Sequence, residues 1–511
     1  MNVSELLMFI LYLVLLVGIG VVFFIRGRSG GEKDYFLGGR QMGAWVSGLS
    51  AGASDMSAWV LMGLPASIYA SGLGKTWIAI GLFIGYTLSW IFVAPRLRAF
   101  SVTCGDAITI PQYLTNRFLS KNRSLQVISA VIFLVAYTVY AASSIKACGT
   151  LFNTVLGMNA VTAMYIAALI ILGYTFLGGF NAVCWTDFFQ GLLMLGALLF
   201  VPVLAAVMME SSGWTPRAVK LPENYYGLLS GGTDWKSFAD IVSGLGWGLG
   251  YFGMPHILIR YFSVKSEKEM RRSQVIGCIW ISLILTASSA VGLVGRRFLG
   301  DDLTGSQDGN TLVFINMVRE VFDWIGSGSG LATLAVFCAG ILLSAILAAA
   351  MSTADSQLLA SASAFASDLY KPLLRKEASD REMLWAGRIV VVCIAAAAYF
   401  IAGDPRCKGL MDLVSCAWAA FGAAFGPVMI LALFWKRLTY PGAVAGIVAG
   451  FAADALWYGF LRNTLIYEIV PGFAAGLAAA VIVSLLTKKP PHEVIELFEA
   501  SRLPPEDPEV R

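Results

Sequence analysis

Apolar segments long enough to cross a membrane follow one another along most of the chain. A membrane-crossing helix needs about 20 predominantly apolar residues. Such segments run from Glu5 to Ile25 and then begin near residues 42, 76, 126, 160, 183, 238, 273, 328, 384, 409, 440 and 464. The pattern predicts an all-α polytopic membrane protein with about thirteen transmembrane helices. The polar segment 488–511 is predicted to be a mobile tail outside the membrane.

Two of the predicted spans carry residues that disfavour a continuous helix. Residues 47–59 read SGLSAGASDMSAW, and residues 243–255 read SGLGWGLGYFGMP; Gly, Ser and Pro all lower helix propensity. Each segment opens a set of five predicted helices, and an odd number of crossings inverts the second set. Two inverted repeats with broken first helices are typical of secondary transporters whose binding site lies near the middle of the bilayer. Close helix–helix packing through small residues is the alternative interpretation.

Composition agrees with a membrane protein and excludes several other classes. Charged residues make up 13% of the chain and apolar residues 58%, with a mean hydropathy of +0.73; a soluble domain carries about 25% charged residues. This composition excludes a disordered chain, a disulfide scaffold and a nucleic-acid-binding protein. Two His and eight Cys, with no Cys-x-x-Cys pair, argue against a metal centre. The sequence has no Walker A motif, which leaves ATP-driven transport unsupported.

The distribution of Lys and Arg predicts the orientation in the membrane. With the N-terminus placed outside, the loops predicted to lie inside carry roughly twice as many Lys and Arg residues as the outside loops, with Arg260 counted among the inside ones. The positive-inside rule therefore predicts a multi-pass protein of the cell membrane with its N-terminus outside and its C-terminus in the cytoplasm.

Polar side chains within two predicted spans are candidates for an ion site. Asp55 lies in mid-span, where a carboxylate costs about 3 kcal/mol, and is interpreted as a cation-attracting group in a water-filled cavity. The alternative is a structural hydrogen-bond acceptor. Ser352 and Thr353 can both reach one hard cation such as Na⁺ if unwound carbonyls near Ala53 and Met56 supply further oxygens. The alternative is that both hydroxyls bond the carbonyl four residues earlier in their own helix.

Four aromatic residues lie in helix interiors rather than at the membrane interfaces: Trp59, Tyr140, Trp247 and Tyr251. Trp247 and Tyr251 are four residues apart and share one helix face. Aromatic rings beside flexible glycines suit an apolar ring or a secondary ammonium group, and packing in the core or against lipid is the alternative. Asp187 follows a short turn at Gly178-Gly179 and is expected near the cytoplasmic interface, where the energetic penalty for a charge is small.

Several segments, in order along residues 32–487, resemble the sodium/solute symporter family. They are 34–40 (DYFLGGR), 49–57 (LSAGASDMS), 246–253 (GWGLGYFG), 341–353 (ILLSAILAAAMST) and 421–427 (FGAAFGP). The resemblance implies two inverted five-helix repeats, with one span before them and two after. The implied divisions are 1–41 (first transmembrane helix and cytoplasmic loop), 42–208 (first repeat), 209–437 (second repeat with its preceding loop), 438–487 (last two helices) and 488–511 (cytoplasmic tail).

The resemblance also implies the roles of particular residues. A sodium site is implied, formed by the carbonyls of Ala53, Met56 and Ala349 and the hydroxyls of Ser352 and Thr353. Asp55 and Ser57 are implied to couple sodium to the substrate. The residues implied to line or gate the substrate pocket are Trp59, Tyr140, Trp247, Tyr251 and Pro255. Arg40 and Asp187 resemble functionally sensitive charges on the inner side.

Two positions depart from the family pattern. Ala58 stands where the proline carriers of this family have Gly, which bears on how closely the backbone is approached there. Asp355 stands where some relatives have Ser. One turn past the hydroxyl pair, it either tunes the release path of the ion or caps polar neighbours.

The function implied by the resemblance is that of a secondary active transporter rather than an enzyme. It would import L-proline by symport with Na⁺ through alternating access. A symporter of the same family for another small solute (pantothenate, another amino acid or a sugar), a channel and a membrane sensor are the alternatives. The implied ligands are L-proline, Na⁺ as coupling ion and the lipid bilayer. No organic cofactor, nucleic acid or obligate protein partner is expected.

Overall fold

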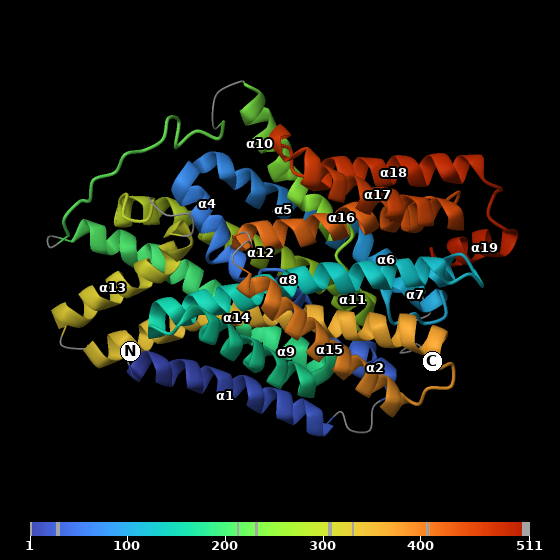
Figure 1. The fold of residues 1–511 in the computed structure, drawn as a ribbon, viewed down its shortest axis with the longest axis horizontal. Coiled ribbons are helices and arrows are strands. Elements are labelled where there is room, and N and C mark those ends of the chain that lie inside the picture. Colours follow the sequence, from blue (N-terminus) through green and yellow to red (C-terminus); the bar gives the residue numbers. More distant parts are fainter. Residues whose placement is uncertain are drawn as a thin grey trace.

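A computed structural model describes residues 3–26, 31–211, 214–229, 234–304, 309–329, 332–404, 407 and 409–502. Within these ranges every regular element is a helix, and one isolated β-bridge joins Met42 to Val264. Most long helices lie side by side along the longest axis of the molecule (Figure 1). They are α1 (Val3–Arg26), α8 (Ser124–Leu156), α9 (Ala160–Glu210), α12 (Glu267–Leu299), α14 (Ala332–Ser363), α15 (Asp380–Gly403), α16 (Leu410–Phe434), α17 (Tyr440–Phe460) and α18 (Ile469–Leu486).

Ten described helical segments are long and apolar enough to cross a membrane, which confirms the prediction of a polytopic membrane protein. The other predicted spans fall on shorter or interrupted helices, so the count of thirteen stays a prediction. Helix α9 contains two predicted spans: Gly179–Glu210 is one of the ten, and Ala160–Gly173 is one of the shorter apolar helices. Where the longer one begins, Gly179 has a non-helical backbone with a φ of 62°. A positive φ is accessible to Gly at little cost, which explains why the chain changes direction at the predicted Gly178-Gly179 turn.

The second predicted span is broken, as its Gly and Ser content predicts. It consists of α3 (Ala44–Ala53), η2 (Ala58–Val60) and α4 (Gly63–Ser71), with residues 54–57 outside these helices. The seventh span consists of α10 (Trp235–Gly246), η5 (Trp247–Phe252) and α11 (Pro255–Ser263). Pro255 occupies the first turn of α11, where its missing N–H costs no helical hydrogen bond. Both interruptions lie among fully buried neighbours.

Leu73–Thr103, one of the ten membrane-crossing segments, is built from four consecutive shorter helices. These four and the other remaining helices complete the bundle. They are α2 (Glu32–Leu37), η1 (Gly38–Arg40), η3 (Leu73–Thr76), α5 (Trp77–Leu88), η4 (Ser89–Val93), α6 (Ala94–Thr103), α7 (Ile110–Arg117), η6 (Gly309–Leu312), α13 (Val313–Ser329), η7 (Ala364–Leu374), η8 (Arg462–Thr464) and α19 (His492–Ala500). Helix α12 packs against α3, α4 and α9, whereas α17 and α18 pack against each other and against α16. In Figure 1, α17 and α18 form one edge of the bundle and α1 the opposite edge.

The polar C-terminal segment differs from the predicted mobile tail. Its helix α19 packs on α6 and α7, and Val494 and Phe498 are buried there. The guanidinium carbon of Arg117 lies 4.8 Å from the centre of the Phe498 ring. A hydrophobic pair within a polar helix is enough to dock it, because burial of each such side chain contributes about 1.5–3 kcal/mol. The last nine positions of the predicted tail lie outside the described residues.

Candidate functional site

The break in the second span brings two backbone carbonyls to one hydroxyl. Ser352 Oγ lies 2.9 Å from the carbonyl oxygen of Ala53 and 3.1 Å from that of Ala349. The contact with Ala349 lies within one helix, whereas the contact with Ala53 joins positions 299 residues apart. The hydroxyl therefore bonds the carbonyl three residues earlier in its own helix, not the one four residues earlier, and it also reaches the carbonyl at the end of α3.

The other two predicted sodium ligands, Met56 and Thr353, are close to Ala53 and Ser352 along the chain, and both are buried. Met56 is fully buried in the unwound segment after Ala53. Thr353 is fully buried, and its hydroxyl oxygen has no hydrogen-bond partner within the described part of the chain. Burying an unpaired hydroxyl is costly, and a hard cation would satisfy such an oxygen. The hydroxyl and carbonyl oxygens are thus ligands of the kind that Na⁺ prefers. Of these groups, Ser352 Oγ lies within hydrogen-bond distance of the Ala53 and Ala349 carbonyl oxygens.

Asp55 connects the two broken helices. Its side chain is fully buried, and the Tyr251 hydroxyl donates a hydrogen bond to Asp55 Oδ2 across 196 residues. Its second oxygen, Oδ1, has no partner among the described residues. The backbone at Asp55 is also held, because Trp59 Nε1 donates to its carbonyl oxygen at 3.2 Å. Ser57 Oγ caps η2 by accepting from the Trp59 backbone N–H at 3.5 Å.

Aromatic rings from three elements meet at the second break. The ring of Trp247 lies 6.1 Å from that of Trp59 and 6.4 Å from that of Trp418. Tyr251 meets Trp418 edge-on at 5.1 Å. Trp418 Nε1 donates to the Trp247 carbonyl oxygen at 2.8 Å, which ties α16 to η5. The structure therefore brings together three of the five residues expected to line the substrate pocket.

The other two expected pocket residues are also buried, but in different settings. Tyr140 is fully buried on α8, and its hydroxyl has no hydrogen-bond partner within the described ranges. Pro255 begins α11 directly after the second break. Ala58 is buried at the start of η2, so an alanine side chain is accommodated at this departure from the family pattern.

Arg40 is a largely buried side chain whose hydrogen bonds link several segments of the chain. Its guanidinium donates to Ser101 Oγ at 2.9 Å, to the Phe262 carbonyl at 2.8 Å and to the Ala107 carbonyl at 2.9 Å. It also forms an ion pair with Asp106 at 2.9 Å. These contacts hold η1 against α6 and α11.

The expectation of a small energetic penalty for the Asp187 charge is wrong, whereas its position near the cytoplasmic interface stays a prediction. Its side chain is fully buried, and Asp187 Oδ2 accepts from Arg260 at 2.7 Å and from Ser50 Oγ at 2.7 Å. Arg260, counted from the sequence as a loop charge, is itself 1% exposed in α11. Sequence reasoning missed Arg260 because the positive-inside count treats every cation near a span end as solvated. A buried carboxylate needs a cationic partner. Asp187 was therefore the signal that could have pointed to Arg260.

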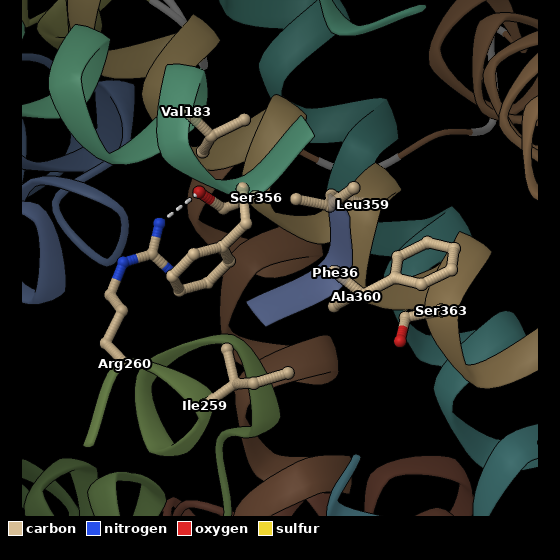
Figure 2. Close-up of a pocket in the computed structure, with 9 residues that line it drawn as sticks. Phe36, Val183, Ile259, Arg260, Ser356, Leu359, Ala360 and Ser363 are labelled. Carbon is tan, nitrogen blue, oxygen red and sulfur yellow. Dashed lines mark hydrogen bonds between the residues drawn. The ribbon is translucent and has the colours of Figure 1, made fainter. Parts of the chain in front are cut away.

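The Arg260 guanidinium reaches a third helix as well. It donates to Ser356 Oγ on α14 at 2.6 Å, as the dashed line in Figure 2 shows. Ser356 Oγ in turn lies 3.3 Å from Asp355 Oδ1, one turn past Ser352. The capping interpretation of Asp355 therefore has an observed contact. The cavity beside Arg260 measures about 10 Å³, room for about one water molecule.

The rings at the second break form an aromatic cluster, and two of its members were not expected from the sequence. The cluster consists of Trp59, Trp247, Tyr251, Trp418 and Tyr467. Trp418 lies three positions before the 421–427 segment, so closeness to that segment was a weak signal. Tyr467 lies in the linker between α17 and α18, and its ring stacks on that of Trp247 at 5.0 Å. Nothing in the local pattern around Tyr467 distinguishes it from an interfacial aromatic.

Comparisons with known proteins agree with this geometry. A model described as the sodium:solute symporter family matches residues 35–450. The chain is 39% identical over 477 residues to the high-affinity proline transporter PutP of Bacillus subtilis, covering 93% of this chain and 97% of the relative. It is 42% identical over 492 residues to the sodium/proline symporter of Escherichia coli, covering 94% of each.

Two solved structures share the arrangement of helices. A Na⁺-coupled sialic acid symporter in a substrate-bound outward-open state matches with a TM-score of 0.75 and 20% identity, over 95% of this chain and 98% of that one. Mhp1, a nucleobase-cation-symport-1 family transporter, matches with a TM-score of 0.56 and 14% identity, over 91% and 98%. At these identities the likeness concerns the fold, and it confirms the predicted transporter architecture.

Proposed function

Because the chain belongs to the sodium:solute symporter family, we propose that it imports L-proline by symport with Na⁺. Its curated relatives at about 40% identity are named as proline transporters and sodium/proline symporters over nearly their full lengths. The observation that carries the proposal is the meeting of Ser352 Oγ with the Ala53 carbonyl at 2.9 Å, at the break of a helix. A hydroxyl and free carbonyls at such a break offer the oxygen ligands that a hard cation requires.

The sodium site consists of the Ala53, Met56 and Ala349 carbonyls with the Ser352 and Thr353 hydroxyls. Ser352 Oγ bonds the Ala53 carbonyl directly. Sodium would take over these oxygens and supply the missing partner of Thr353. Because the ligands come from α3 and α14, binding of the ion draws these two helices together. This differential contact is what lets an ion shift a conformational equilibrium.

The substrate site lies between the two breaks, where Asp55 and the aromatic cluster meet. Trp59, Trp247 and Tyr251 offer ring faces to an apolar pyrrolidine, and Asp55 offers negative charge near its secondary ammonium group. Tyr140 lines the same region from α8, while Ser57 and Pro255 set the backbone at the two breaks. The Tyr251–Asp55 hydrogen bond couples the substrate side to the sodium side.

The membrane arrangement follows the same proposal. Residues 42–208 and 209–437 form the two inverted repeats, 1–41 and 438–487 flank them, and 488–511 is the cytoplasmic tail. The N-terminus lies outside and the C-terminus inside the cell membrane, as the Lys and Arg distribution predicts. Arg260, Asp187 and Arg40 then lie on the cytoplasmic side of the sodium site, where the Arg260–Asp187 network closes α11 against α3, α9 and α14.

The decisive experiment is uptake of radiolabelled L-proline into proteoliposomes with and without a sodium gradient. One Na⁺ moving down 100 mV yields about 2.3 kcal/mol, and a tenfold sodium gradient adds about 1.4 kcal/mol. One-to-one coupling then sustains roughly 500-fold accumulation. Accumulation that ignores the sodium gradient would refute symport, and flux without accumulation would indicate a channel. Competition by unlabelled pantothenate, other amino acids and sugars tests the choice of substrate.

A further inference from the structure

The linker between α17 and α18, residues 461–468, crosses the aromatic cluster from outside the two repeats. Its Tyr467 ring stacks on the Trp247 ring with a centroid separation of 5.0 Å and an interplanar angle of 27°. Tyr467 is 8% exposed and Trp247 6% exposed. Of the rings around Trp247, that of Tyr467 is nearer than those of Trp59 and Trp418. The contact therefore covers a face of Trp247 that would otherwise be open.

The linker is tied to α10, the helix that leads into Trp247. Trp235 Nε1 donates to the Thr464 carbonyl at 3.2 Å. Ser243 Oγ donates to the Leu465 carbonyl at 3.1 Å and accepts from the Tyr467 N–H at 2.9 Å. One serine thus uses both its proton and a lone pair to fix the backbone on either side of the turn.

The linker is also tied to α16. The Tyr467 hydroxyl donates to the Ser415 carbonyl at 2.7 Å. Arg462 pairs with Asp412 at the start of the same helix. Closer to the cluster, Gly246 lets α18 approach the end of α10, because a Cβ there would lie 2.6 Å from Val470 Cγ2. The orientation of the Tyr467 ring is therefore fixed at its backbone, its hydroxyl and its stacked face.

We propose that Tyr467 is a positioning residue for the substrate site, holding the Trp247 ring in the orientation that the substrate requires. The inference rests on the proposed function, because Trp247 is taken there as a wall of the proline pocket. It assigns to α17 and α18, which lie outside both repeats, a direct part in substrate affinity. Sodium affinity is not expected to depend on Tyr467, because the proposed sodium ligands lie at the first break and on α14.

Three substitutions separate the stacked ring from its hydrogen bond. Tyr467→Leu removes the ring while keeping a bulky apolar side chain. Tyr467→Phe keeps the ring and removes only the bond to Ser415. Trp457→Phe is the matched control, because Trp457 Nε1 donates to the Ile466 carbonyl in the same linker at 3.0 Å and its ring is not part of the cluster. Membrane abundance and melting temperature of each purified variant are measured first.

Uptake kinetics give the first test. We expect Tyr467→Leu to raise the KM for L-proline about 3- to 10-fold, the range expected for loss of an aromatic pair. The maximal rate per transporter and the sodium concentration for half-maximal uptake should stay within about twofold. Tyr467→Phe and Trp457→Phe should keep the wild-type KM within about twofold. An unchanged KM in Tyr467→Leu, or an equal loss in Tyr467→Phe, would overturn the proposal, as would a matching change in sodium dependence.

A second test needs no substrate, so it remains decisive if the protein transports another solute. Hydrogen–deuterium exchange of η5 is compared in wild type, Tyr467→Leu and Tyr467→Phe in nanodiscs. Exchange in η5 should become at least about threefold faster in Tyr467→Leu alone, because the stack that holds Trp247 is lost. Equal exchange in all three proteins would overturn the positioning role. Failure of the wild type to take up proline would instead overturn the proposed substrate.

Discussion

The two broken helices are interrupted in different ways. Between α3 and η2 the chain leaves the helix through residues 54–57, and a buried carboxylate and hydroxyls occupy the gap. In the second break the chain does not open but tightens into the 3₁₀ helix η5, with Trp and Tyr between glycines. The first break exposes polar groups toward Ser352, whereas the second presents aromatic rings.

Packing around the breaks explains this difference. Gly248 in η5 lies so close to α5 that a Cβ on it would be 2.3 Å from the Gly81 carbonyl oxygen, and one on Gly85 would be 2.1 Å from the Gly248 carbonyl oxygen. Backbone thus packs on backbone at the second break, which leaves no room for an open loop. At the first break Trp59 Nε1 holds the Asp55 carbonyl, so the unwound backbone stays fixed without closing. Under the proposed function, the first break would supply ion ligands and the second would supply an aromatic wall of the substrate pocket.

The largest expected effect comes from removing the charge at the first break. Asp55→Asn keeps the size of the side chain and the acceptor for Tyr251, but loses the negative charge. A unit charge at short range in an effective dielectric near 20 contributes on the order of 2–4 kcal/mol, or roughly 30- to 700-fold in cation affinity. We expect Asp55→Asn to abolish sodium-driven uptake, and Asp55→Glu to retain weak uptake with poorer sodium affinity.

Membrane abundance and uptake of both Asp55 variants decide this prediction. Asp323→Asn on the exposed face of α13 is the control for the same chemical change outside the site. If Asp55→Asn is active and normally expressed while Asp55→Glu misfolds, Asp55 is a structural acceptor and the electrostatic interpretation is lost.

The next effect tests whether the hydroxyls opposite the first break bind sodium. Ser352→Ala combined with Thr353→Ala removes two oxygen ligands. We expect the sodium concentration for half-maximal uptake to rise at least about tenfold, or about 1.4 kcal/mol. Ser344→Ala is the matched control on α14, because Ser344 Oγ donates to the Gly340 carbonyl of its own helix at 2.8 Å. An unchanged sodium dependence in the purified double variant would place the ion elsewhere.

At the second break the expected effect is on stability. Gly248→Ala forces a Cβ against the backbone of α5, and overpacking of this kind costs about 1–3 kcal/mol. Gly196→Ala on α9 is the control, because a Cβ there meets nothing within 4 Å. Thermal unfolding in detergent should show a lower melting temperature for Gly248→Ala only. Equal melting temperatures would mean that η5 can move away from α5 at little cost.

The smallest expected effect concerns how the two broken helices begin. Helix α10 starts on its own cap, since Asp234 Oδ1 accepts from the Ser237 N–H at 3.0 Å. Helix α3 has no such local cap, and its Ala44 N–H donates to Glu269 of α12 at 2.7 Å. We expect Asp234→Ala to lower the melting temperature at pH 7 by no more than about 2 °C.

This small effect should depend on pH in a defined direction. The hydrogen bond from the Ser237 N–H holds the pKa of Asp234 below its ordinary value of 3.8. The carboxylate therefore contributes its stability above that ordinary pKa and loses it as the pH falls through the lower pKa of the folded state. The difference between wild type and Asp234→Ala should shrink as the pH falls below 3.8. Asp234→Asn, which keeps a good cap without a titrating group, should show no such trend.

The sequence by itself determined the membrane class, most of the apolar spans and both interruptions. These features depend on runs and spacings within one segment, where residue type alone sets hydropathy and helix propensity. The adjacent hydroxyls of Ser352 and Thr353 and the mid-span charge of Asp55 were visible for the same reason. The family segments added the expected ligand set, which no local pattern contains.

Only the tertiary structure decided which distant groups meet. The Ser352–Ala53 contact, the Asp187–Arg260 pair and the Tyr467–Trp247 stack each join segments far apart in the sequence. Hydropathy scores each residue separately, so it cannot tell a cation that pairs with a buried carboxylate from one that faces water. Pairing depends on which helix faces pack together, and the whole bundle settles this, because a buried charge or hydroxyl is costly where the packing gives it no partner.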